Sequence, residues 1–177
     1  MTPESDHQLW PWLNSYEAVP ELAGYRPVIG DRGMISSPHY LASAIGADIL
    51  KAGGNAVDAA IAASAALMVV CPMQCGPGGD AFWIVRDRSN RIIVLDAAGP
   101  APFAANAAAL RAEGLREMPK RGARAVTVPG AVAGWFEAHG RFASLSMEAL
   151  LSPAASLAES GFLATRHTRA SFLACQP

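Results

Sequence analysis

The pattern of apolar and polar positions predicts a buried, alanine-rich helix as the element around which the chain is organised. Residues 56–70 are small or aliphatic on nearly every face, so the helix is expected to be buried all round. Asn55 stands at the N-cap position, and Asp58 follows where its carboxylate can accept from free backbone N–H groups. Pro72 then ends the helix, because proline cannot continue its hydrogen-bond pattern.

Further segments with helical spacing of apolar residues accompany this central helix. The first covers residues 38–52, with Ser37 as its cap, Pro38 at the first helical position and Gly53-Gly54 as the stop. Others are predicted at residues 104–113, 131–139 and 146–160, the last between a Ser146 cap and Gly161.

Short runs with strand-like alternation predict an antiparallel hairpin from residues 81–86 and 91–96, with a turn at residues 88–90. Two more strands are predicted at residues 33–37 and 122–128. Residues 1–27 contain several prolines and are predicted to form an extended arm, ahead of a single domain over residues 28–177. The expected class is therefore α/β (α+β), with alanine-rich helices packed on an antiparallel sheet.

Composition excludes several classes of protein. The chain has 177 residues, 51% of them hydrophobic, and a formal net charge of −1, which suits one domain with a core. Its scattered basic residues argue against nucleic-acid binding. Residues 1–7 do not resemble a secretory signal, and the apolar run 59–70 is too short for a bilayer, which takes ~20 residues. Because three cysteines make no even disulfide framework, we expect a cytoplasmic protein, the alternative being a form matured by removal of a signal.

The glycine loop at residues 76–79 is the strongest local candidate for ligand contact. Its backbone N–H groups could hold an anion or an oxyanion, although spacing alone favours a tight structural turn. No Gly-Lys-Ser/Thr follows, and the loop joins a helix to a strand, so it matches neither common nucleotide-binding motif.

The remaining candidates favour structural interpretations. Gly53-Gly54-Asn55 could bind phosphate, but capping by Asn55 and Asp58 is the better explanation. Cys71 and Cys75 lack a second ligand pair, which favours free thiols over zinc, and we expect neither a metal nor a cofactor. No Ser/His/Asp triad can be assembled, and His39 and His139 are given ordinary surface roles.

Several stretches, in order over about residues 26–162, together resemble one family. They are GMISSPHYLASAIGADILKAGGNAVDAAIAA, VVCPMQCGPGGDAFWIVRD, LDAAGPAP, AVTVPGAVAGWFEAH and LLSPAASLAESGF. They are similar to the GGNAVDAA signature, the S-G-x-G-G-G-x-F loop, and the D-x-R-E-x-A-P, VPG-x-x-x-G and P-A-x-x-L-A-x-x-G-F segments of the gamma-glutamyltransferases. The chain thus resembles the N-terminal part of the large subunit of these N-terminal-nucleophile (Ntn) hydrolases.

This resemblance implies an αββα sandwich and a proenzyme that cuts itself to expose an N-terminal threonine. That threonine attacks an amide carbonyl and forms an acyl-enzyme. It also implies a small-molecule amide or gamma-glutamyl substrate, and as partners the rest of the large subunit and the small subunit. Thr127, Thr165 and Thr168 lack the family's T-T-x-x-x context, so no catalytic residue is assigned here and the chain alone is expected to be inactive.

Two departures from the family pattern concern substrate recognition. Asp96 aligns with the leading Asp of D-x-R-E-x-A-P, but Ala98 stands where the family has the arginine that grips the donor's α-carboxylate. Asp80 stands where the family's loop usually has glycine. The resemblance makes Gly78, Gly79, Asp80, Asp96 and Ala98 the candidate substrate-binding residues, with weak recognition of gamma-glutamyl donors.

Two other kinds of function stay open on the sequence. One is a catalytically inactive remnant or structural subunit of the same family, and a related amidohydrolase or acylase is a variant of the leading hypothesis. The other is a nucleotide-binding module that uses the glycine loops, which the motifs support poorly.

Overall fold

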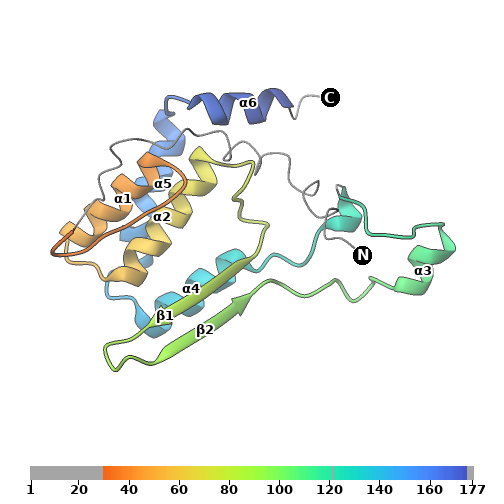
Figure 1. Ribbon diagram of the computed structural model, residues 1–177, viewed down its shortest axis with the longest axis horizontal. Coiled ribbons are helices and arrows are strands. Elements are labelled where there is room, and N and C mark those ends of the chain that lie inside the picture. Colours follow the sequence, from red (N-terminus) through yellow and green to blue (C-terminus); the bar gives the residue numbers. More distant parts are fainter. Residues whose placement is uncertain (1–29, 121, 175–177) are drawn as a thin grey trace, which may run out of the picture. The chain divides into compact units, whose positions relative to one another are not determined.

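The computed structural model describes residues 30–120 and 122–174, and the main compact unit begins at Gly33 (Figure 1). The expected α+β class is confirmed, since helices accompany a small antiparallel sheet. The elements are α1 (Tyr40–Lys51), α2 (Ala56–Val70), β1 (Ala81–Arg86), β2 (Ile92–Ala97), α3 (Ala107–Ala112), the 3-10 turn η2 (Ala123–Ala125), α4 (Ala131–Phe142), α5 (Met147–Ser160) and α6 (Arg166–Ala174). The arm predicted at residues 1–27 lies outside the described residues.

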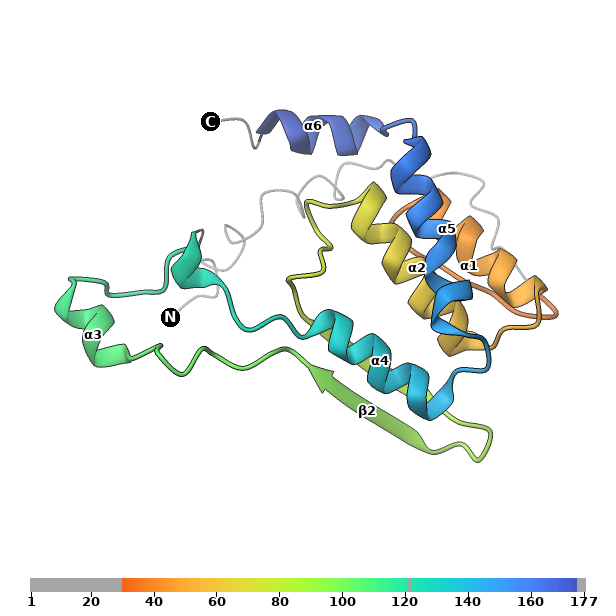
Figure 2. The same ribbon diagram turned by 180° about the vertical axis from the view of Figure 1, so that it is seen from behind.

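Helix α2 is the central element, as predicted, and both α1 and α5 pack against it (Figures 1 and 2). Ile61, Ala62 and Ala66 are fully buried at this contact, together with Leu150 of α5. Small alanine side chains let the three helices approach closely, which concentrates apolar burial in one layer. The expectation of burial all round is wrong on one side, where Ala56 is exposed and Ser64 and Leu67 are half-buried.

The start of α2 is fixed by the predicted capping box. Asn55 Oδ1 accepts from the backbone N–H groups of Val57 and Asp58, and Asp58 Oδ2 accepts from the Asn55 N–H at 2.7 Å. The same carboxylate also accepts from Ser144 and Leu145 in the connection between α4 and α5. The capping box therefore also links the start of α2 to the connection between α4 and α5.

The predicted hairpin is present, with its second strand shifted by one residue. Strands β1 and β2 are antiparallel, and their register pairs Trp83 with Leu95 and Val85 with Ile93 on the face that packs against the core. Helix α4 covers this face (Figure 2). On the opposite face, Phe82, Ile84, Ile92 and Val94 are exposed.

Two predictions about the start of the described chain are wrong. Residues 33–37 are extended but form no strand, because no ladder partner lies within the described residues. Helix α1 begins at Tyr40 instead of Pro38, with His39 as its N-cap, and His39 Nδ1 accepts from the Leu41 N–H at 3.2 Å. The Ser37 hydroxyl instead contacts the His39 carbonyl and the Ser43 hydroxyl. Gly53, with φ of 92°, ends α1 as expected.

Other boundaries differ farther along the chain. Residues 122–128, predicted as a strand, contain η2 and then irregular extended backbone. Helix α3 is shorter than the predicted residues 104–113, and α4 continues to Phe142, beyond the predicted end at residue 139. Helix α6 was not predicted at all. No helix within the described ranges is long and apolar enough to cross a membrane.

Candidate functional site

The glycine loop is tied to the start of α4. After α2 ends, the Gln74 and Cys75 N–H groups both donate to the Cys71 carbonyl, which forms the turn leading into the loop. At the other end of the loop, the Gly79 carbonyl accepts from the N–H groups of Gly130 at 3.1 Å and Ala131 at 2.9 Å. Helix α4 has no side-chain cap, so the loop backbone satisfies its first free N–H groups.

Glycine is required at two positions where this loop, the hairpin and α4 meet. A Cβ on Gly130 would lie 2.2 Å from the Ala97 carbonyl oxygen, and one on Gly99 would lie 1.9 Å from that of Val128. Gly99 also has a φ of 75°, a conformation that other residues rarely adopt. The backbones of three segments therefore meet directly at the open end of the hairpin.

The hairpin register brings the candidate residues from both strands together at this end. Ala81 pairs with Ala97, so Asp80 and Ala98 follow on opposite strands one step farther along. The Asp96 side chain lies on the exposed face, and its Oδ1 accepts from the Ala98 N–H at 3.0 Å. Asp80 Oδ1 accepts from the Thr127 hydroxyl at 3.3 Å. Gly79, Asp80, Asp96 and Ala98 thus form one group, although the sequence separates them by up to nineteen positions.

A cavity of about 350 Å³ adjoins this group between β2 and α4. Its ionisable lining residues are Asp96 and Glu137, and the Glu137 carboxylate is paired with Arg141 on the next turn of α4. The other lining residues are apolar or glycine: Leu95, Ala97, Gly99, Pro100, Pro129, Gly130, Ala133 and Gly134. With Asp80 nearby, the region presents acidic and apolar groups and is a poor environment for a further carboxylate.

The hairpin arginines lie at the opposite end of the sheet. Arg86 pairs with Ile92, four positions from the Phe82–Asp96 pair, which corresponds to about 14 Å along a strand. Arg91 is held in the turn by Asp87, whose Oδ2 accepts from Arg91 Nε at 2.8 Å. These arginines therefore lie away from Ala98.

The threonines of the described part take structural roles. Thr168 is buried on α6, and its hydroxyl donates to the Val70 carbonyl at the end of α2. Thr165 caps the start of α6 by accepting from the Thr168 N–H. With the Thr127 hydroxyl donating to Asp80, all three hydroxyls make internal contacts.

Cys71 and Cys75 lie in surroundings that suit a structural role. Burial raises the pKa of the Cys71 and Cys75 thiols, which keeps them protonated and weakly nucleophilic. The described residues contain no cluster of three or more His, Cys, Asp or Glu side chains able to hold a metal.

His39 does not have the surface role expected for it. It is buried between Tyr40 and Phe162, and burial lowers its pKa. His139 donates from Nε2 to the Leu145 carbonyl at 2.8 Å, so it holds the connection between α4 and α5.

Sequence reasoning missed the tertiary role of Asp58. This side chain is fully buried, and its carboxylate accepts from the Ser144 hydroxyl at 2.6 Å and from the N–H groups of Asn55, Ser144 and Leu145. Burial alone would raise its pKa, but these hydrogen bonds outweigh that effect and hold the pKa below its usual value. Only the local part of this arrangement has a sequence signature, the spacing of Asn55 and Asp58.

Comparison with known proteins finds one family model and several curated relatives that match most of the chain. The family model described as Gamma-glutamyltranspeptidase matches residues 42–175. The Acylase ACY 1 proenzyme of Pseudomonas sp. (strain V22) is 42% identical over 166 residues, covering 86% of this chain and 30% of the relative. The Glutathione hydrolase-like YwrD proenzyme of Bacillus subtilis (strain 168) is 40% identical over 139 residues, covering 77% of this chain and 26% of the relative.

A solved structure agrees with these sequence matches. The crystal structure of Helicobacter pylori gamma-glutamyltranspeptidase superposes with a TM-score of 0.79 at 31% identity, covering 84% of this chain and 44% of that one. The chain therefore spans less than a third of the length of the two curated relatives.

Proposed function

The chain belongs to the gamma-glutamyltranspeptidase family, and on that premise we propose that it forms part of an enzyme that cleaves an amide and transfers or hydrolyses the acyl group. A threonine hydroxyl outside the described residues adds to the amide carbonyl, and its own α-amine takes the proton. The amine of the substrate leaves, and the acyl group passes from threonine to water or to an acceptor amine. The described residues provide scaffold and one wall of the pocket.

The proposed donor lacks a carboxylate at the position where gamma-glutamyl donors carry one. The observation that supports this is the hairpin register, which ends with Ala81 paired to Ala97 and so brings Asp80, Asp96 and Ala98 to the same end of the sheet. A donor carboxylate would meet two acids there, with no guanidinium to pair with. An acylase with a neutral acyl donor fits this wall better than a glutathione hydrolase, and relatives with both kinds of name match the chain.

Donor preference in the complete product of the gene tests this proposal. We expect neutral N-acyl amides to be turned over with a higher kcat/KM than gamma-glutamyl p-nitroanilide or glutathione. Ala98→Arg should raise kcat/KM for gamma-glutamyl p-nitroanilide by about tenfold or more, because a charge-assisted hydrogen bond contributes roughly 1.5–3 kcal/mol. Ala112→Arg adds the same charge at an exposed position on α3 and should leave the preference unchanged.

Two outcomes would contradict the proposal. Glutathione as the best donor would refute the neutral acyl donor while leaving amide cleavage intact. A complete gene product that turns over no amide would refute the enzymatic function and favour a structural role for this family member. The 177-residue chain assayed alone is expected to be inactive in both cases.

A further inference from the structure

The cavity between β2 and α4 follows one face of the helix. Its lining residues on the helix side recur three or four positions apart, which places them on the same face. They are Gly130, Ala133, Gly134 and Glu137. From the first to the last of them a helix advances about 10 Å. The cavity, of about 350 Å³, therefore has the length of two helical turns, with β2 and the residues after it as the other wall.

One end of this cavity lies at the candidate site. Gly99, which lines the cavity, directly follows Ala98 in the chain. Gly130, at the same end, donates its N–H to the Gly79 carbonyl of the glycine loop. Glu137 marks the opposite end. A ligand held at the candidate site can therefore extend into the cavity, away from the loop and along α4.

The charges in the lining already have partners. Asp96 Oδ1 accepts from the Ala98 N–H at 3.0 Å, and the Glu137 carboxylate is paired with Arg141. The other lining residues are apolar or glycine, with small side chains on the α4 side. A surface of this kind binds a hydrocarbon chain by removing apolar area from water, and it offers no partner to a further charge.

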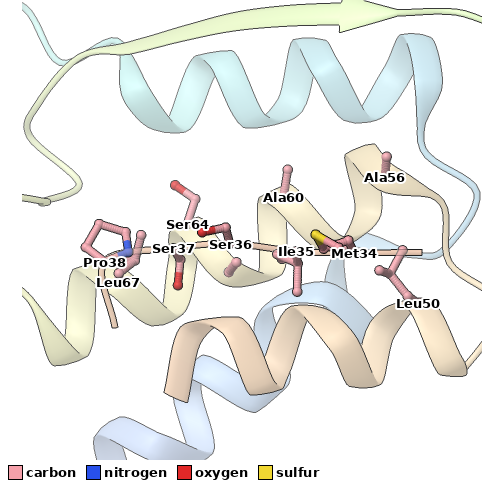
Figure 3. A pocket seen from close by; sticks show the side chains of 12 residues that line it. Met34, Ile35, Ser36, Ser37, Pro38, Leu50, Ala56, Ala60, Ser64 and Leu67 are labelled. Carbon is pink, nitrogen blue, oxygen red and sulfur yellow. The ribbon is translucent and has the colours of Figure 1, made fainter. Parts of the chain in front are cut away.

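A second apolar groove, of about 360 Å³, does not meet the same conditions. It lies on α2, where Ala60, Ser64 and Leu67 line it together with Met34 and Ile35 (Figure 3). None of the candidate residues of the glycine loop and the hairpin lines this groove. A ligand seated there would not continue from the candidate site, so the cavity between β2 and α4 is the better choice.

We propose that the cavity between β2 and α4 binds the hydrocarbon chain of the acyl donor, a linear acyl group of medium length. An extended chain advances about 1.2 Å per bond, so a cavity about 10 Å long takes roughly eight carbons. Ala133 lies midway along the cavity, and the ion pair of Glu137 and Arg141 limits its far end. The inference rests on the proposed function for the amide, which lies at the Ala98 end.

A series of linear N-acyl p-nitroanilides, assayed with the complete gene product, tests this inference. The series runs through acetyl, butyryl, hexanoyl, octanoyl and dodecanoyl. Each methylene that enters the cavity should raise kcat/KM roughly three- to fourfold, from the free energy of burying one methylene. The gain should stop at about eight carbons, so dodecanoyl should be no better than octanoyl.

A cavity-filling variant locates the chain. Ala133→Leu places a larger side chain midway along the cavity, so the ratio of kcat/KM for octanoyl to that for acetyl should fall about tenfold or more, as two or more methylenes lose their place. Ala155→Leu makes the same change at an exposed position on α5, outside the cavity, and should leave the ratio unchanged. If Ala133→Leu does not fold, the chain-length series with the unsubstituted protein decides alone.

Calorimetry separates binding of the chain from turnover. Octanamide should bind the complete gene product at least about 100-fold more tightly than acetamide, because it buries six more methylenes. Octanamide binding without turnover of any amide would contradict only the proposed function. Neither binding nor turnover would contradict both proposals.

Three results would overturn the acyl-chain site while leaving amide cleavage intact. The first is a kcat/KM that does not rise with chain length. The second is a gain that continues undiminished to dodecanoyl, since the cavity ends at Glu137. The third is an octanoyl-to-acetyl ratio that folded Ala133→Leu leaves unchanged, which would place the chain elsewhere.

Discussion

At the scale of single residues, Asp58 carries the densest set of polar contacts in the described part of the chain. Its two oxygens accept from three backbone N–H groups and one hydroxyl, in a site with no solvent exposure. Hydrogen bonds to an ionised group contribute more than those between neutral groups, and a buried carboxylate is tolerated only when it is satisfied in this way. Asp58 is therefore an anchor between α2 and the connection that follows α4.

Replacing this anchor should cost stability. Asp58→Asn keeps the shape but removes the charge and turns one acceptor into a donor that faces other donors. We expect the free energy of unfolding to fall by about 2–3 kcal/mol, measured by urea denaturation. Asp48→Asn, which removes only an exposed ion pair with Lys51, should change it by less than about 1 kcal/mol. Equal effects for the two variants would show that Asp58 is no anchor.

The same side chain predicts how stability depends on pH. The pKa of Asp58 is lower in the folded chain than in the unfolded chain, so its contribution is complete above the unfolded pKa. That contribution is lost as the pH falls through the folded pKa. The stability difference between the original chain and Asp58→Asn should therefore be constant near neutral pH and shrink in acid. A difference that grows on acidification would contradict the assigned direction.

Residue-level prediction from sequence succeeded where the contact is local. The spacing of Asn55 and Asp58 identifies their capping box, because both partners lie within one turn. Ser144 lies 86 positions from Asp58, and no periodicity links the two. The burial of His39 was missed for the same reason, since Phe162 covers it from a distant part of the chain.

At the scale of elements, the contact between the glycine loop and α4 places the candidate site. The Gly79 carbonyl caps α4, and the Gly130 backbone lies against the Ala97 carbonyl at the end of β2. This contact fixes where Asp80 and Ala98 lie relative to the cavity between β2 and α4. The position of the site therefore depends on a backbone junction that side-chain patterns do not specify.

A pair of glycine substitutions in and beside α4 tests this junction. Gly130→Ala forces a Cβ to within 2.2 Å of a carbonyl oxygen, so we expect a loss of about 2–4 kcal/mol on urea denaturation. Gly140→Ala, which meets no atom within 4 Å, should instead stabilise α4 by about 0.5–1 kcal/mol. If Gly130→Ala were as well tolerated as Gly140→Ala, the close approach would be wrong.

The elements that sequence reasoning predicted well are those with their own capping or turn residues. Helix α5 begins after Ser146 and ends at Gly161, and the hairpin turns at residues 88–90, as expected. The prediction of a strand at residues 122–128 was wrong, because alternation alone does not supply a neighbouring strand. Residues 33–37 have the extended backbone expected of them, but a ladder needs a second chain segment.

At the scale of the whole molecule, the outer face of the hairpin is an apolar surface that the described residues leave exposed. Phe82, Ile84, Ile92 and Val94 have exposed fractions between 63% and 79%, while the opposite face packs on the helices. Sheets with apolar residues on both faces are usually covered on both. The chain studied alone is therefore expected to associate with itself or to be poorly soluble.

Polar substitutions on this face test that expectation. The double variant Ile84→Thr, Val94→Thr changes two residues that are paired directly across the strands, and it keeps β-branched side chains. Self-association, followed by sedimentation velocity over a range of concentrations, should decrease while the free energy of unfolding changes by less than about 1 kcal/mol. Val85→Thr with Ile93→Thr alters the inward-facing pair and should destabilise the chain instead. A monomer at all concentrations in the unsubstituted chain would contradict the prediction.

Fold class and family could be predicted from the sequence because several motifs occur in order along one chain. The candidate site could be predicted only as separate residues, since the register that brings Asp80 and Ala98 to one end of the sheet depends on how β1 and β2 pair. The cavity beside them depends in addition on α4, whose approach is set by Gly130 and Gly134. Composition and periodicity carry no information about such distances between elements.

The bond between Asp58 and Ser144 also has a consequence for biosynthesis. These residues are 86 positions apart, so the bond cannot form on the ribosome until both have left the exit tunnel. Until then the nascent α2 has only its local capping box, and the Asp58 carboxylate stays hydrated. The helical layer can therefore gain this link only after residues 143–145 have emerged, whatever the helix propensity of α2.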